Sequence, residues 1–412
     1  MGMARNLRLL PWIRFCQSLL FWQATWFLYF QSNLSAGQAI LLYAVFDLAS
    51  TLTEVPSGYL SDRLGRRRTL VVAAATLLAG SAALGLGDGF GAALVGQALL
   101  GAGFAIVSGT DSAITYESLP ASGRETAIEA MELRLYRFGF VALALSALIG
   151  GAMAMFSLRL PFLASALASA VMLALTLLLV EPARHLDHSA QGAEIADPSL
   201  RAALGRALRQ PALRWLFAAA VLAYVLSHLP FVFGQPFIED ALAGIGIASG
   251  APMVSGVVTA AMMLLSVAVS LVAPALRRRL GIGPVVIVAL LMQIGLIAGL
   301  ALSGSVWIIG LLVMRMVPDA LSRPYIAART QPLLEDGLRA TWLSLQGLVA
   351  RLVLGGSLLV ASAWAGARDR MDHDQIAVVL GVYALAGVAA VLTLAATRRR
   401  ARIDVGTGAS QG

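Results

Sequence analysis

Twelve apolar stretches dominate this sequence, each long enough to cross a lipid bilayer as a helix. Crossing ~30 Å of hydrocarbon takes roughly 20 mostly apolar residues, and a helix satisfies its own backbone hydrogen bonds there. The stretches lie near residues 10–30, 37–59, 69–87, 91–112, 134–156, 160–180, 213–233, 251–276, 283–303, 306–325, 341–364 and 376–397. Only 13% of the 412 residues are charged, against about 25% in soluble domains. The sequence therefore predicts an all-α membrane protein with twelve transmembrane helices.

The first stretch follows Arg5 and Arg8, as the apolar part of a secretory signal peptide would. It is too long for one, carries Trp22, Gln23 and Trp26, and lacks a small-residue cleavage site. We therefore interpret it as the first transmembrane helix.

The basic residues are all arginine, and their distribution predicts the topology. Without a lysine there is no Walker A motif, so we expect no ATP motor and secondary or facilitated transport instead. Arginines gather in alternate connections, which by the positive-inside rule places both termini and the central loop in the cytoplasm. The net charge of +8 then reflects topology, and we expect no nucleic-acid partner.

An internal repeat divides the chain. The segment PSGYLSDRLGRRR (56–68) follows the second stretch and VAPALRRRLGIGP (272–284) follows the eighth, so that Leu64-Gly65 matches Leu280-Gly281. This favours a duplicated six-helix unit with a site between its halves. We predict an N-terminal bundle at 1–180, a linker at 181–211, a C-terminal bundle at 212–397 and a tail at 398–412.

The linker is polar and is expected to end in an amphipathic helix lying on the membrane surface. Asp197 is placed to cap this helix, and Leu200, Leu204 and Leu208 form an apolar stripe beside arginines.

The loop between the second and third stretches resembles the signature loop of the major facilitator superfamily. It spells GxxxDRxGRR with Gly58, Asp62, Arg63, Gly65, Arg66 and Arg67. The resemblance implies two pseudo-symmetric six-helix bundles, no enzymatic activity, and a bacterial inner (plasma) membrane carrier similar to drug-efflux proteins.

The resemblance also implies a gate. In this family the loop aspartate lies against the start of the eleventh helix, which here is near Arg339. The expected partners of the loop arginines are Asp111 and Glu117, and Glu54 is expected to serve the same gate. Arg278 occupies the aspartate position in the second half, so only the first half is expected to latch in this way.

Two hallmarks of proton-coupled exporters in this family are altered. The fourth stretch has Gln97 where an arginine is common, and the fifth has SALIGG (146–151) without the usual proline.

Ionisable residues inside apolar spans are costly and therefore indicate function. Asp47, Arg315 and Arg351 lie near the middle of their spans, and a pair between Asp47 and one of the arginines is expected to act either in coupling or as a permanent link between bundles. Asp319 lies four residues after Arg315, so the two are also able to satisfy each other.

By resemblance, Trp22, Gln23 and Trp26 of the first span and Tyr224 and His228 of the seventh line a central cavity. Anchoring of the aromatic residues at the membrane interface is the alternative.

Taken together, these features predict a secondary active transporter working by alternating access, with export of an amphipathic or drug-like compound as first choice and proton coupling as an option. Import of an anionic metabolite is one alternative, and a non-transporting membrane sensor is another. The expected partners are the lipid bilayer and a small-molecule substrate, with no metal, no other cofactor, no ATP and a monomeric state.

Overall fold

The computed structural model describes residues 2–119, 128–182, 198–334, 338–366, 371–401 and 403. Within these ranges the chain is helical, with no β-strand. Ten of the described helices are long and apolar enough to cross a membrane. This confirms an all-α membrane protein, and the two predicted spans missing from the ten, near 10–30 and 306–325, are interrupted in the structure.

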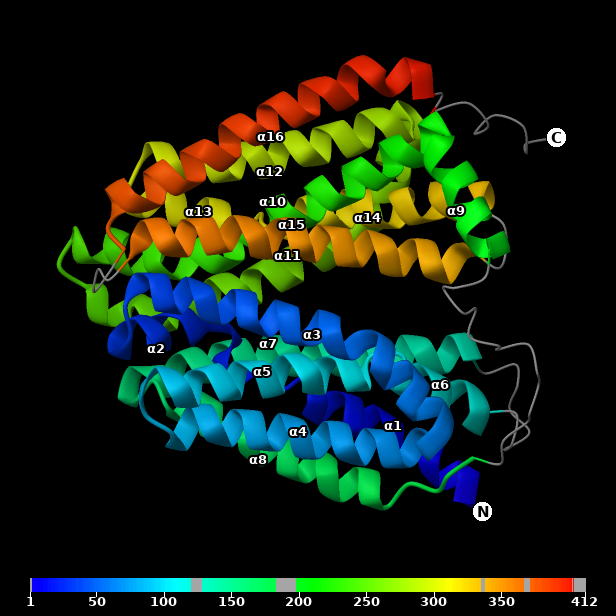
Figure 1. Ribbon diagram of the computed structural model, residues 1–412. Coiled ribbons are helices and arrows are strands. Elements are labelled where there is room, and N and C mark those ends of the chain that lie inside the picture. Colours follow the sequence, from blue (N-terminus) through cyan, green and yellow to red (C-terminus); the bar gives the residue numbers. More distant parts are fainter. Residues whose placement is uncertain are drawn as a thin grey trace. The chain divides into compact units, whose positions relative to one another are not determined.

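The first of two compact units, here unit 1, comprises residues 1–186, 242–260 and 355–371. Its helices include α3 (Ala36–Leu64), α4 (Arg66–Leu86), α5 (Gly89–Val107), α6 (Thr110–Ser118), α7 (Ile128–Phe156) and α8 (Leu160–Leu177). Helix α4 packs against both α5 and α8, and α3 packs on α5 (Figure 1). Leu70, Ala73, Leu77 and Leu84 are buried at helical spacing on α4, so one stripe of this apolar helix contacts protein and the rest is available to lipid.

The second compact unit, here unit 2, comprises residues 187–241, 261–354 and 372–412. In it, α12 (Ile282–Leu302) packs against α14 (Val317–Thr330) and α16 (His373–Ala401) (Figure 1). Trp215 of α10 (Pro211–Ala243) donates a hydrogen bond to the Leu394 carbonyl of α16 at 2.8 Å. Helices α11 (Ala251–Leu280) and α15 (Arg339–Ala365) each contribute one part to each unit.

The first span is broken into α1 (Gly2–Gln17), the short 3-10 helix η1 (Phe21–Ala24) and α2 (Trp26–Asn33). A break in a span frees backbone groups that lipid cannot satisfy, so protein must do so. The Ser165 hydroxyl of α8 accepts from Phe21 N at 3.1 Å and lies 3.4 Å from Leu19 O. Gln23 donates from Nε2 to the Leu143 carbonyl of α7 at 2.9 Å. These polar side chains stabilise the break.

Gly150 brings α7 into direct backbone contact with η1. A Cβ atom at this position would overlap the Phe21 carbonyl. Only glycine, which has no side chain, permits this approach.

The tenth span is broken between α13 (Ile309–Leu312) and α14. Here Val313, Met314 and Arg315 donate from their backbone N–H groups to carbonyls three residues earlier, at 3.3, 2.9 and 3.1 Å. Pro318 explains the break, because its ring would clash with the Met314 carbonyl in a continuous α-helix and it has no N–H to donate. Arg315 therefore lies in the interruption.

The sequence repeat has a structural counterpart at two glycines. Gly65 separates α3 from α4 with φ +100°, and Gly281 separates α11 from α12 with φ +82°. Positive φ values favour glycine. The match of Leu64-Gly65 with Leu280-Gly281 thus corresponds to the same kind of turn in both places.

The predicted helix exists as α9 (Pro198–Arg209). Ala203 and Ala207 are buried, in a cluster with Leu213, Leu334, Leu338 and Trp342, and Leu204 packs partly against it. Leu208 is 39% exposed, and the side chain of Leu200 lies outside the described residues. The helix thus packs on unit 2 through its small side chains, and contact of the leucine stripe with the membrane surface stays a prediction.

Candidate functional site

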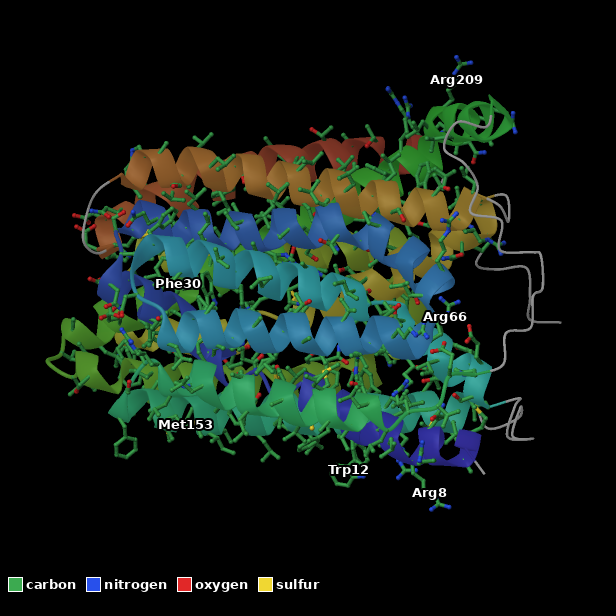
Figure 2. The ribbon with its side chains drawn as sticks, turned by 60° about the horizontal axis from the view of Figure 1, so that its bottom comes forward. Arg8, Trp12, Phe30, Arg66, Met153 and Arg209 are labelled. Carbon is green, nitrogen blue, oxygen red and sulfur yellow. The ribbon has the colours of Figure 1, made fainter. Side chains whose placement is uncertain are left out.

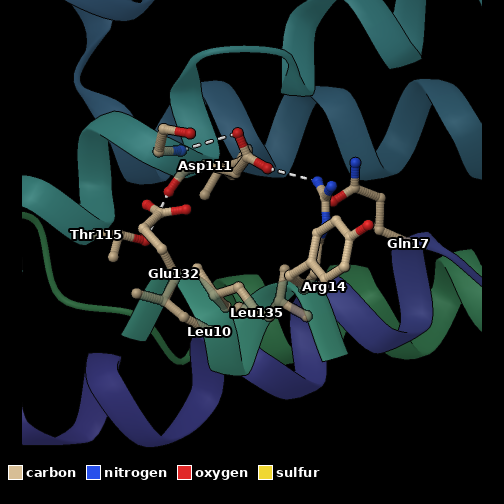
Figure 3. A pocket seen from close by; sticks show the side chains of 11 residues that line it. Leu10, Arg14, Gln17, Asp111, Thr115, Glu132 and Leu135 are labelled. Carbon is tan, nitrogen blue, oxygen red and sulfur yellow. Dashed lines mark hydrogen bonds and ion pairs between the residues drawn. The ribbon is translucent and has the colours of Figure 1, made fainter. Parts of the chain in front are cut away.

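Unit 1 contains a cavity of about 420 Å³ between α1, α4, α6 and α7 (Figure 3). Its walls are apolar on one side and polar on the other. The lining residues are Leu10, Ile13, Arg14, Gln17, Leu70, Asp111, Ser112, Thr115, Glu132, Leu135 and Tyr136. Its size lies within the range of roughly 300–1,000 Å³ that is usual for small-molecule sites.

One ion pair closes part of this cavity. Arg14 of α1 contacts Asp111 of α6, with Nη1 and Oδ2 2.8 Å apart, and Asp111 Oδ1 accepts from the Ser112 N–H at 2.8 Å (Figure 3). The prediction that Asp111 pairs with an arginine of the signature loop is therefore wrong. Arg14 outcompetes the loop because α1 and α6 pack side by side.

The signature loop is held by other carboxylates. Arg66 Nε lies 2.9 Å from Glu117 Oε1, and its Nη1 donates to Ser61 Oγ at 2.9 Å. This confirms Glu117 as a partner of the loop arginines. Arg67 donates from Nη2 to the Leu177 carbonyl at 2.7 Å.

Three other residues of the predicted gate, Arg63, Glu54 and Gly58, are exposed. The side chain of Asp62 lies outside the described residues, so the latch predicted for it stays a prediction.

Glu181, which the sequence did not single out, caps the start of α4. Its two carboxylate oxygens accept hydrogen bonds from the backbone N–H groups of Arg66 and Arg67, at 2.6 and 3.1 Å. A carboxylate at a helix N-terminus satisfies orphan donors and interacts favourably with the helix dipole. It ties the signature loop to the residues that follow α8.

We expect Glu181→Gln to destabilise the protein by about 0.5–2 kcal/mol, since the amide loses the charge and turns an N–H₂ group toward a backbone donor. The melting temperature of the purified protein in detergent measures this. Asp374→Asn, at an exposed position in the first turn of α16, is the control for loss of a favourable charge near a helix N-terminus alone, and should lower the melting temperature less than Glu181→Gln does. Equal melting temperatures of the two variants would show that the cap by Glu181 does not stabilise this loop.

Unit 2 contains a second cavity, of about 230 Å³, between α10, α14 and α15. Most of its walls are small or apolar, with a few polar groups among them. It is lined by Ala220, Ala223, Tyr224, Arg323, Ile326, Ala327, Thr330, Leu343, Gln346, Gly347 and Ala350.

A charge network centred on one buried carboxylate lies beside this second cavity, and its arginine is half exposed. Asp319 is 7% exposed, and its Oδ2 is 3.1 Å from Arg323 Nη2. Gln293 of α12, 2% exposed, donates to Asp319 Oδ1 at 3.1 Å. Arg323 also lies 3.5 Å from Ser227 Oγ of α10. Three helices therefore meet at one buried carboxylate.

Tyr224 and His228 of the predicted cavity lie one turn apart on α10, with ring centroids 4.0 Å apart. His228 Nδ1 lies 2.6 Å from the Tyr224 carbonyl, which can only accept, so this nitrogen carries the proton. Tyr224 lines the cavity of unit 2, next to the charge network.

Of the other predicted charges, Arg315 lies with its guanidinium 4.9 Å from the centre of the Phe231 ring and its Nε 3.2 Å from Met262 Sδ. Asp47 is buried on α3. Its predicted pairing with Arg315 or Arg351 stays a prediction.

The tryptophans of the first span divide into two groups. Trp12 is 51% exposed and points away from the helices (Figure 2), as an anchor at the membrane interface would. Trp22 and Trp26 are buried, Trp22 stacked on Phe162 and Trp26 against Tyr43. Together with Gln23 they lie outside the cavities of unit 1 and unit 2, and their predicted role in substrate binding is still untested.

Several residues of these sites were missed. Arg323 was not singled out, although it lies on α14, which continues to Thr330. The signal was its position four residues after Asp319, where an ion pair on one helix is expected. Gln293 and Arg14 are polar groups inside apolar stretches, which is itself a signal. Nothing in the sequence distinguishes Glu181.

Apolar helices that carry polar cavities and a buried carboxylate form an arrangement that suits a membrane transporter of small solutes. The chain belongs to the Major Facilitator Superfamily, whose sequence profile matches residues 12–386. A search of curated proteins gives no match.

Solved structures of transporters share this fold. A point mutant of the nucleoside transporter NupG has a TM-score of 0.75 at 14% identity, over 96% of this chain and 100% of the other. A point mutant of the peptide transporter POT in complex with sulfate has a TM-score of 0.75 at 14% identity, over 98% of this chain and 96% of the other. A POT family transporter in complex with 5-aminolevulinic acid has a TM-score of 0.70 at 14% identity, over 96% of each chain. At this identity the likeness concerns the fold alone.

Proposed function

We propose that this protein is a proton-coupled secondary transporter that exports a small amphipathic compound across the inner (plasma) membrane by alternating access. The observation that carries the proposal is the ion pair between Asp319 and Arg323, 3.1 Å apart, beside a cavity in an apolar bundle. Buried charges are costly in such a setting and are kept where they serve transport.

The network supplies a way to couple a proton to the cavity. Arg323 both lines the cavity and pairs with Asp319. When a proton binds the Asp319 carboxylate, its negative charge is lost and the Arg323 charge is left uncompensated. When the proton leaves, the pair is neutral again. Protonation therefore changes the net charge at the cavity by one unit, which biases the conformations that open it.

The wider arrangement belongs to the same proposal. The bundles at 1–180 and 212–397 act as the two moving halves, with both termini in the cytoplasm and the protein working as a monomer. Asp47, Arg315 and Arg351 serve as charges between the bundles, and Asp62 serves as the latch of the signature loop.

An anionic substrate is less well supported. Such a ligand needs guanidinium groups that are not already engaged. Arg14 and Arg323, the arginines that line the two described cavities, are each bound to a carboxylate.

The test is transport by purified protein in proteoliposomes with an acidic interior. Ethidium is the probe, because its permanent charge prevents passive trapping by the pH gradient. We expect the probe to accumulate faster than in empty liposomes, and a protonophore to abolish the difference. Cells that produce the protein should also accumulate less ethidium than cells that do not. Transport of anionic probes alone would favour the importer, and no transport across a broad panel would favour a sensor.

A further inference from the structure

We infer that the cavity of unit 1 recognises a protonated amine, and that Glu132 is the residue that binds it. The inference rests on the proposed transport function and names the substrate class. It follows from the balance of charges and of hydrogen-bond partners in the cavity lining.

The lining of this cavity has an excess of negative charge. It contains one cation, Arg14, and two carboxylates, Asp111 and Glu132. Arg14 and Asp111 neutralise each other at 2.8 Å. The charge of Glu132 is left to attract a ligand, and Figure 3 shows this side chain with Arg14 and Gln17 around one opening.

Two acceptor atoms in the lining are hidden from solvent and accept no hydrogen bond in the described part of the chain. They are Glu132 Oε1 on α7 and Gln17 Oε1 at the end of α1. Buried acceptors without a partner cost free energy. An alkylammonium group offers up to three donors and no acceptor, so it suits either oxygen once the side chain turns that atom toward the cavity. Figure 3 shows Glu132 and Gln17 on opposite sides of the opening, so the two residues offer separate positions for a donor.

The remaining walls fit the body of an amphipathic amine. Leu10, Ile13, Leu70 and Leu135 are apolar, and Tyr136 offers an aromatic ring. An aromatic ring also attracts an organic cation through its face. A bare metal cation fits poorly, since Ca²⁺ takes 6–8 oxygen ligands and Mg²⁺ about six, whereas the cavity leaves Glu132 as its one carboxylate outside an ion pair.

Binding to the purified, full-length protein tests the inference. The probes are arylalkylamines built on indole, naphthalene and biphenyl, such as tryptamine, each with its neutral N-acetyl derivative and its matched carboxylic acid. We expect the amines to raise the melting temperature of the protein and the neutral and acidic analogues to leave it unchanged. Equal binding of the N-acetyl derivatives, or preferential binding of the acids, would overturn the inference.

The variant Glu132→Gln keeps the size of the side chain and removes its charge. It should weaken amine binding by about tenfold or more, as expected for the loss of a hydrogen bond to a charged group. Gln17→Met should also weaken amine binding, and this variant tests the site if Glu132→Gln does not fold. Asp374→Asn, an equivalent loss of one carboxylate outside both cavities, should bind amines unchanged. Unchanged amine affinity in Glu132→Gln contradicts the assignment.

The binding assay tests the amine site and the proteoliposome assay tests transport, so failure of one is distinguishable from failure of the other. Amine binding that depends on Glu132, without transport, keeps the site and removes the transport function. Proton-driven transport of neutral analogues, with full activity in Glu132→Gln, keeps transport and removes the amine site.

Discussion

Replacing Asp319 by asparagine is expected to abolish proton-driven accumulation in proteoliposomes while leaving exchange of substrate across the membrane intact. Asparagine resembles the protonated carboxyl group in size and charge, so the Arg323 charge stays permanently uncompensated and no longer responds to the proton gradient. Gln293 can still hydrogen-bond to the amide oxygen in place of Asp319 Oδ1. Uptake driven by an acidic interior and exchange at equal pH measure the two activities.

The control for this experiment is Asp374→Asn, which removes an exposed carboxylate at the start of α16 and should retain both activities. Asp319→Ala is the harsher change. It leaves a space at the buried position of Asp319 and removes the acceptor of Gln293, while Arg323 is half exposed, so this variant should be less stable than Asp319→Asn. Accumulation by Asp319→Asn at the rate of the unmodified protein would exclude Asp319 as the coupling residue and leave Asp47 as the candidate.

Replacing Gly150 by valine is expected to prevent folding, because the new side chain would occupy the space of the Phe21 carbonyl. The obstacle is backbone held by Ser165, which cannot rotate aside as a flexible side chain does. Gly150→Ala should be recoverable but less stable by about 1–3 kcal/mol, as expected for an overpacked contact. Size-exclusion profiles and melting temperatures in detergent measure both effects.

Gly295 offers the matched control, since it lies in the interior of α12 and a Cβ atom there would meet no atom of another segment within 4 Å. Gly295→Ala should be neutral or stabilising by up to about 1 kcal/mol, through helix propensity alone. If Gly150→Ala melts as high as Gly295→Ala, then η1 is not held by direct contact with α7.

The sequence was a good guide to the spans and a poor one to their interruptions. Apolar length alone predicted the ten continuous helices. Pro318 is a sequence signal for the break before α14, because proline disfavours a continuous helix, although α10 continues through Pro230 and Pro236. The break after Gln17 has no such residue, and its cause is the set of hydrogen bonds from Ser165 and Gln23, which no local pattern contains.

In the candidate sites, too, the sequence predicted some features and not others. Asp319 was found because a carboxylate in an apolar span is costly. Arg315 was considered as one possible partner and Arg323 was not, whereas the structure pairs Asp319 with Arg323. Glu117 was correctly paired with the signature loop and Asp111 was not. Periodicity likewise predicted helix α9 but not its contact with unit 2 through Ala203 and Ala207, because hydropathy gives little weight to small side chains that allow close approach. Charge and hydropathy indicate which residues matter, while partners depend on packing between distant segments.

The interrupted first span also bears on how the chain matures in the membrane. The fragment α2 has 8 residues, far fewer than the roughly 20 that a helix needs to insert alone. The hydroxyl that supports the break comes from Ser165, 146 residues after Leu19. During synthesis the ribosome reaches this serine only after five spans have been made. We therefore expect the nascent first span to insert as one apolar helix and to acquire its break only when the sixth span packs beside it.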